Sequence, residues 1–188
     1  MKTGVIVLIV VVLALVMGGC EYVGERNKLA MEREAINGQW SQVDADLQRR
    51  ADLIPNLVET VKGYAKEETT VFSTVANARS QLLNAKSPQE KIDANNQLTG
   101  ALGRLLVVVE NYPNLKANEN FRQLQFELEG TENRILQSRR RYNEAVQKYN
   151  TDISLFPANV VAAMAGFQRE DAYFKTEPGA RPAPKVQF

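Results

Sequence analysis

The sequence contains no histidine, and Cys20 is its single cysteine among 188 residues. Histidine is the usual general base and the commonest metal ligand, so its absence argues against Ser-His and Cys-His catalysis and against zinc sites. Aromatic residues make up 7% of the chain, and 23 Lys and Arg nearly balance 22 Asp and Glu. Since there is no excess of positive charge to attract phosphates, we predict no nucleic-acid partner, and no small-molecule substrate is identified.

Carboxylates are the remaining candidates for catalysis. Glu127, Glu129 and Glu132 lie close together in the sequence and could form a metal site or a glycosidase pair. A solvated helix face often carries such a cluster, and it favours no reaction. The three arginines at 139–141 point around a helix rather than to one face, and acidic residues nearby balance them. We therefore expect a non-enzymatic protein without a cofactor or a metal.

The first twenty residues differ from the rest. Lys2 precedes the apolar run "VIVLIVVVLALVM" at 5–17, and two glycines and Cys20 follow that run. In one interpretation "MGGC" resembles a bacterial lipobox, so that residues 1–20 are a signal peptide with Cys20 as the lipidation site. In the other, residues 3–19 stay as an uncleaved signal anchor. Both predict a membrane-anchored protein of the bacterial cell envelope with residues 21–188 in the periplasm, and both leave inner or outer membrane open.

Apolar residues after this segment follow a seven-residue repeat typical of packed helices. The first stretch keeps its phase through Pro55, so we predict one long kinked helix from about 28 to 85. A helix boundary at residues 52–56, with Asp52 as N-cap, is the alternative. The positions that carry this first repeat are Trp40, Leu47, Ile54, Val61, Glu68, Val75 and Leu82.

Two further helices are expected. A capped start for the second helix is predicted by Ser87, Pro88 and Glu90. This helix ends at "ENYPNLKAN". Its Gly100 and Gly103 would allow another backbone to approach closely. The third ends at "LFP", residues 155–157, and "ANVVAAMAGF" could form a capping helix. The seven-residue repeat of the third helix predicts buried positions at Phe121, Leu128, Ile135, Tyr142 and Tyr149.

The expected fold is all-α, an elongated antiparallel helical bundle with a long kinked first helix and an N-terminal membrane anchor. We place the bundle at 21–167. The segment 168–188 contains three prolines and few residues to bury, so a disordered tail is expected there.

Several seam and surface residues lead to sharper expectations. Arg50 and Glu68 are polar residues at seam positions, and we hypothesise that Arg50 pairs with an acidic group of the third helix. Tyr64, like the seam tyrosines of the third helix, is expected in the core. The run "LLVVV" is apolar around more than one helix face, so it is either buried at the bundle end or a self-association surface; its members are Leu105, Leu106, Val107, Val108 and Val109.

Taken together, "RRADLIPNLVETVKGYA" (49–65), "ENYPNLKANENFRQLQFEL" (110–128), "TENRI" (131–135), "RYNEAV" and "KYN" (141–150) resemble the LemA family of bacterial envelope proteins. The resemblance implies a helical bundle with an N-terminal membrane anchor and supplies no activity, although some relatives look like participants in membrane remodelling and organelle formation. Many relatives have Ala-x-His-Glu where this chain has Ala65-Lys66-Glu67-Glu68, so Glu67 stands at the position of their histidine. The residues matching family motifs or seam positions are Arg50, Asp52, Pro55, Asn56, Lys62, Gly63, Tyr64, Asn111, Tyr112, Pro113, Leu115, Lys116, Asn118, Phe121, Tyr142 and Asn143.

The leading hypothesis is a membrane-anchored helical scaffold that self-associates, as a homo-oligomer, or organises membrane and partner proteins. The alternative is a monomeric accessory or sensory module that binds one envelope partner, such as a membrane protease or transporter.

Overall fold

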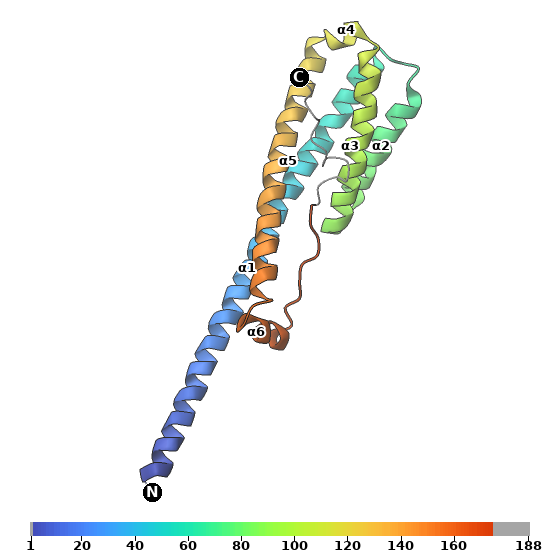
Figure 1. Ribbon diagram of the computed structural model, residues 1–188. Coiled ribbons are helices and arrows are strands. Elements are labelled where there is room, and N and C mark those ends of the chain that lie inside the picture. Colours follow the sequence, from blue (N-terminus) through green and yellow to red (C-terminus); the bar gives the residue numbers. More distant parts are fainter. Residues whose placement is uncertain (1, 175–188) are drawn as a thin grey trace, which may run out of the picture. The chain divides into compact units, whose positions relative to one another are not determined.

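The computed structural model describes residues 2–174, which form six helices and no strand (Figure 1). This confirms the all-α prediction. The helices are α1 (Lys2–Lys62), α2 (Thr69–Asn84), α3 (Pro88–Glu110), α4 (Pro113–Lys116), α5 (Glu119–Asp152) and α6 (Ala158–Ala165). The chain divides into two compact units: an N-terminal unit of Met1–Ser41 with Arg141–Asp171, and a central unit of Gln42–Arg140 with the segment from Ala172.

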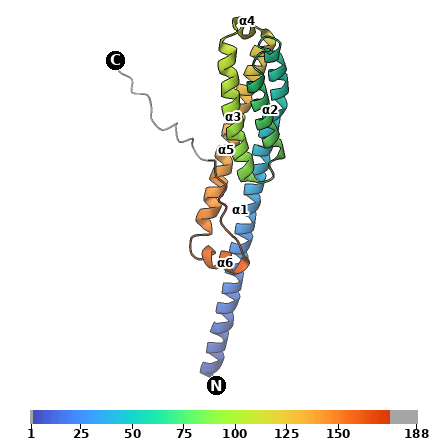
Figure 2. The same cartoon turned by 90° about the vertical axis from the view of Figure 1, so that its right-hand side faces the viewer.

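The central unit is a bundle of four antiparallel helical segments from α1, α2, α3 and α5. Arg79 of α2 reaches Ala51 of α1, whereas Lys62 at the end of α1 lies over Phe72 near the start of α2, so these two helices run in opposite directions. α2 and α3 lie side by side (Figures 1 and 2). The core of this unit includes Leu47, Ile54, Leu57, Val61, Val75, Leu82, Leu98, Leu105, Leu115, Phe121 and Ile135.

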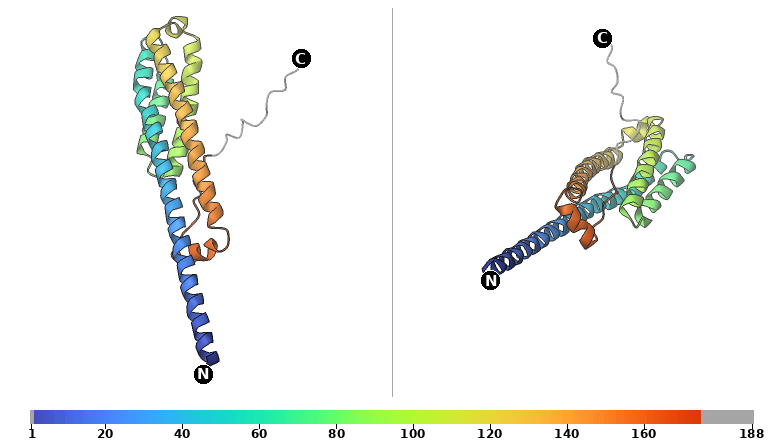
Figure 3. Two further views of the ribbon diagram at one scale, coloured as in Figure 1. Left: turned by 90° about the vertical axis from the view of Figure 1, so that its left-hand side faces the viewer. Right: turned by 60° about the horizontal axis from the view of Figure 1, so that its bottom comes forward.

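The N-terminal unit contains the first part of α1, the last part of α5, and α6. Lys28 of α1 lies 3.1 Å from Asp152 of α5, and Lys148 contacts Glu32, so the two segments are antiparallel. α6 lies against α1 in this unit (Figure 3). Its core includes Leu29, Ile36, Tyr142, Val146, Tyr149, Ile153 and Val161.

The prediction of one helix from 28 to 85 is wrong. α1 passes through Pro55, which excludes a boundary at 52–56 as well, but it ends at Lys62 and α2 begins at Thr69. Gly63 weakens the helix at this point. The seven-residue repeat does not reveal this change of chain direction, because Val61 and Val75 are buried on either side of the turn and the phase of apolar residues continues across it. Glu68, a charged residue at a seam position, is the signal that marks the turn.

The helix starting at residue 88 is confirmed in detail. The Ser87 side chain accepts a hydrogen bond from the Glu90 N–H, and the Glu90 carboxylate accepts from the Ser87 N–H. The two glycines of α3 do not serve the predicted close approach, because a Cβ added at Gly100 or Gly103 would meet nothing within 4 Å. Both glycines are exposed, so the backbone of α3 is open to solvent at these positions.

The third predicted helix is confirmed as α5, and the capping helix as α6. Tyr142 and Tyr149 are buried as expected, but Tyr64 is 43% exposed because it follows the end of α1. Of the predicted disordered tail, residues 175–188 lie outside the described residues. Before them, the Tyr149 hydroxyl donates to the Gln168 carbonyl at 2.9 Å, which holds this part of the chain against α5.

Candidate functional site

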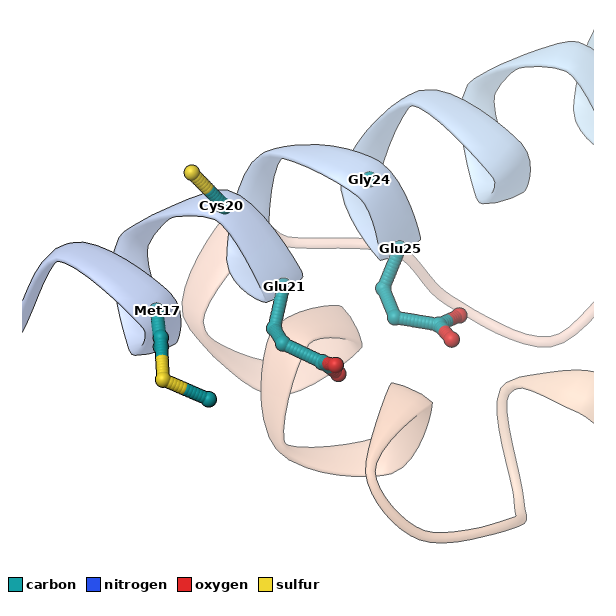
Figure 4. A pocket seen from close by; sticks show the side chains of 5 residues that line it. All are labelled: Met17, Cys20, Glu21, Gly24 and Glu25. Carbon is teal, nitrogen blue, oxygen red and sulfur yellow. The ribbon is translucent and has the colours of Figure 1, made fainter. Parts of the chain in front are cut away.

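The segment around Cys20 forms an exposed part of α1. The cysteine is free, and its Sγ points away from the side of the helix that carries Glu21 and Glu25 (Figure 4). Within the described residues, α1 is the one helix that is long and apolar enough to cross a membrane. Lipidation of Cys20 stays a prediction.

Arg50 joins α1 to two other helices of the central unit. It is 6% exposed, and its Nη1 donates to Asn95 Oδ1 at 2.8 Å and to Thr99 Oγ1 at 3.1 Å on α3. Its Nη2 lies 3.2 Å from Glu132 Oε2 on α5 and forms an ion pair rather than an aligned hydrogen bond. The hypothesis that Arg50 pairs with an acidic residue of the third predicted helix is therefore confirmed. We call Arg50, Asn95, Thr99 and Glu132 the Arg50 cluster.

Pro55 explains how α2 attaches to α1. Proline has no N–H, so the carbonyl of Ala51, four residues earlier, lacks its usual partner within the helix. Arg79 of α2 occupies this acceptor, with its Nε 2.7 Å from the Ala51 oxygen. Ala51 is fully buried, and an unpaired carbonyl there would be costly. The proline in the middle of α1 thus creates a binding point for the neighbouring helix.

This arrangement predicts a coupling between Pro55 and Arg79. Arg79→Met is expected to lower the free energy of unfolding by about 1–3 kcal/mol, because the buried Ala51 carbonyl loses its donor. In a Pro55→Ala background the new N–H bonds that carbonyl, so the same substitution should cost clearly less. Urea unfolding of the four proteins of this double-mutant cycle measures the coupling. Equal costs in the two backgrounds would show that the Arg79 contact does not depend on the proline.

Two motif residues connect the two turns at one end of the central unit. Asn118 Nδ2 donates to the Tyr64 hydroxyl at 3.0 Å, while its Oδ1 accepts from the Phe121 N–H at 3.0 Å at the start of α5. A single asparagine therefore joins the α1–α2 turn to a helix N-terminus. Phe121 and Leu115 are buried beside it. The sequence placed these residues in one motif but gave no sign of the contact with Tyr64.

The other motif residues have local structural roles. Asn111 is the C-cap of α3, Tyr112 precedes α4, and Pro113 begins it. Lys116 pairs with Glu110 at 2.6 Å, and Lys62 with Glu59 at 2.7 Å. Asp52, Asn56 and Gly63 are also exposed, and Asn143 is half-buried. The Asp52 carboxylate accepts from Gln48 at 2.9 Å, and the Asn56 carbonyl accepts from the Thr60 hydroxyl at 2.8 Å. None of these contacts forms a catalytic arrangement.

The "LLVVV" run is divided between core and surface. Leu105, Val108 and Val109 are buried, whereas Leu106 is 43% and Val107 68% exposed. Leu106 and Gly103 border a cavity of about 370 Å³ at the surface of the central unit, which we call the α1–α3–α5 groove. Its walls are mostly apolar, and Arg50, Thr99 and Glu132 of the Arg50 cluster contribute polar groups together with Gln125 and Glu129. The lining residues are Arg50, Leu57, Thr99, Leu102, Gly103, Leu106, Gln125, Leu128, Glu129 and Glu132.

The candidate carboxylates have different surroundings. Glu132 pairs with Arg50, and Glu129 is exposed and accepts from Gln125 at 3.2 Å. The Glu127 carbonyl accepts from Thr131 at 2.8 Å. In residues 2–174 no group of three or more His, Cys, Asp or Glu is placed to hold a metal ion. Of the arginine run, Arg139 lies over the Phe174 ring, 4.6 Å from its centroid.

A charged network holds the N-terminal unit together. Asp152 lies 3.1 Å from Lys28 and 3.2 Å from Lys148, which also contacts Glu32. The neighbouring Glu32 side chain and then the Lys28 ammonium lower the pKa of Asp152 to about 2. Burial raises the pKa of Glu32. Asp152 is consequently ionised throughout the physiological range and keeps its pairing with both lysines.

Comparison with known proteins finds one family and several relatives. The family model described as the LemA family matches residues 39–188. Magnetosome proteins MamQ 1 and MamQ 2 of Paramagnetospirillum magneticum are each 28% identical over 178 residues, covering 81% of this chain and 65% of the relative. Protein LemA of Metamycoplasma hominis is 28% identical over 142 residues, covering 75% of this chain and 65% of that protein. The matches thus span less than two thirds of the length of these relatives.

The family match extends over most of the chain and includes the Arg50 cluster, the Pro55 contact and the Tyr64–Asn118 connection. The chain therefore belongs to the LemA family.

Proposed function

We propose that this chain is a non-enzymatic, membrane-anchored scaffold of the bacterial cell envelope, which self-associates through the α1–α3–α5 groove. The observation that carries the proposal is the combination of an open apolar groove with exposed apolar residues beside it. In this proposal the apolar run at 5–17 anchors the chain, and the helices after it lie outside the cytoplasm. The relatives named as magnetosome proteins support a role as a structural component of a larger assembly.

The shape of this surface favours a second copy of the chain as its occupant. On α3, Gly103, Leu106 and Val107 share one face by their spacing of three and four residues. A groove and an adjoining apolar ridge on one surface can interlock with the same surface of a second copy about a two-fold axis. Gly103 has open space around it, so another helix can approach the backbone there.

Charge and geometry further support self-association. Residues 21–188 contain 22 basic and 22 acidic residues, because Lys2 is the single charged residue before them. Copies of the chain therefore do not repel one another through net charge. Anchoring to one membrane raises their effective concentration, so even a modest groove contact can sustain an assembly.

A pair of glycine substitutions tests the proposal. Gly103→Leu fills the groove and should reduce the oligomer fraction of the full chain in detergent or nanodiscs, measured by mass photometry. Gly38→Leu is the matched control, since Gly38 is an exposed glycine inside α1 that has open space around it and does not line the groove. Both substitutions should preserve or raise helix stability, as glycine costs about 1 kcal/mol in a helix interior. An equal oligomer fraction in both variants, or a monomeric parent protein, contradicts the proposal.

A further inference from the structure

α6 and the residues before it carry an apolar surface that the proposed scaffold role does not use. Residues 153–167 contain no Asp, Glu, Lys or Arg. Ala158, Val161 and Ala162 are buried, but Phe156 is 83% exposed, Val160 50% and Met164 71%. Val160 and Met164 are four residues apart and share one face of α6. Phe156 precedes the helix and borders one cavity together with them, so the three side chains form one apolar stripe.

The stripe lies beside the part of α1 that directly follows the apolar run. A cavity in the N-terminal unit is bordered by Gly18, Glu21 and Tyr22 of α1 together with Phe156, Val160 and Met164. Gly18 directly follows the apolar run, which ends at Met17. Figures 2 and 3 show α6 beside this part of α1. The apolar stripe is therefore next to the place where an anchored chain leaves the bilayer, whether residues 3–19 span it or Cys20 carries acyl chains.

We propose that α6, with Leu155 and Phe156, lies in the membrane surface and inserts its exposed stripe into the boundary between lipid headgroups and acyl chains. Amphipathic helices with an apolar face and aromatic residues bind at this depth. The element gives the protein a second membrane contact beside the anchor, and two contacts fix the orientation of the N-terminal unit on the bilayer. The proposal rests on the membrane anchoring of the proposed function but not on self-association.

The chemistry of the stripe selects the type of lipid contact. The cavity beside it has two carboxylates, Glu21 and Glu25, and no basic residue among those that border it. Attraction to anionic lipids needs clustered Lys or Arg. The contact is thus hydrophobic, and we expect it to be equally strong on zwitterionic phosphatidylcholine and on vesicles that also contain phosphatidylglycerol.

Quenching of tryptophan fluorescence by brominated lipids measures this contact. The background is Trp40→Phe in the full chain, made by cell-free synthesis into phosphatidylcholine vesicles, because Phe keeps a ring against Tyr142. Phe156→Trp is the test variant and Leu13→Trp reports on the anchor. Met31→Trp is the matched negative control, an exposed position of the same unit about 21 Å beyond Met17 at 1.5 Å per residue of α1.

Lipids with bromines deep in the acyl chains should quench most of the fluorescence of Leu13→Trp. Lipids with bromines close to the headgroups should quench most of the fluorescence of Phe156→Trp. Met31→Trp should lose little. Adding Val160→Asp and Met164→Asp to the test variant should abolish its quenching, and both positions are exposed, so the fold is kept. If Leu13→Trp is quenched but Phe156→Trp behaves like Met31→Trp, the α6 contact is absent while the anchor is real. If Leu13→Trp is not quenched either, both proposals are wrong.

Discussion

Replacing Tyr142 with alanine is expected to lower the free energy of unfolding by about 3–5 kcal/mol, the usual cost of removing a fully buried aromatic side chain. Tyr142 is 1% exposed, and its ring meets that of Trp40 edge-on, with centroids 5.2 Å apart. The substitution removes this contact and leaves a cavity between α1 and α5 of the N-terminal unit. Guanidinium unfolding of the full chain in detergent, followed by circular dichroism, measures the loss.

Two controls separate the buried ring from a general effect of losing an aromatic residue. Tyr142→Phe keeps the ring against Trp40 and should retain most of the stability. Phe126→Ala removes a ring that is largely exposed, so it should change stability by no more than about 0.5 kcal/mol. If Tyr142→Ala were no more harmful than Phe126→Ala, the packing described for the N-terminal unit would be wrong.

Replacing Arg50 with methionine should cost about 2–4 kcal/mol, because Asn95 then keeps a buried oxygen without its donor and Glu132 loses its charge partner. Asn95 is almost completely buried, whereas Glu132 is partly solvated, so most of the loss is assigned to Asn95. Methionine retains the length of the arginine stem and limits the cavity. Chemical unfolding monitored by circular dichroism gives the magnitude.

The physical cause can be tested by rescue. Adding Asn95→Leu to Arg50→Met replaces both partners of the buried hydrogen bond by apolar groups, which is often neutral or stabilising. The double variant should therefore be more stable than Arg50→Met alone. A double variant that is less stable than either single variant would mean that the cavity, and not the unpaired polar group, dominates the loss.

Local signals in the sequence predicted parts of the fold well. The capped start at Ser87 depends on three nearby residues, so a sequence pattern is enough to find it. The partner of Arg50 could be predicted as an acidic residue of the third helix, since a buried charge needs a counter-charge. Which acid takes this role follows only from packing, and among the three clustered glutamates it is Glu132.

Other features depend on contacts that no local pattern encodes. The turn at 63–68 was missed because the apolar phase is the same before and after it. The Ala51–Arg79 contact requires that α2 fold back on α1, which the missed turn concealed. Tyr64 and Asn118, and likewise Lys28 and Asp152, come together only when distant segments pack. The apolar stripe of α6 is visible in the sequence as an uncharged stretch, but its position beside Gly18 is not.

Two successive residues of the first motif thus organise the central unit: Arg50 binds α3 and α5, and the carbonyl of Ala51 binds α2. Beside these contacts, the groove that Arg50 also lines stays open in the structure. The proposed scaffold role depends on this uncovered apolar surface.

Site-specific photocrosslinking in native membranes tests the self-association most directly. A photoreactive amino acid at Leu106, on the edge of the groove, should yield adducts of two copies of the chain, with crosslinked peptides from α1, α3 or α5. The same group at Asn56, an exposed residue outside the groove lining, should yield few. Adducts of Leu106 with one unrelated protein and none with a second copy would contradict the self-associating scaffold and support an accessory module.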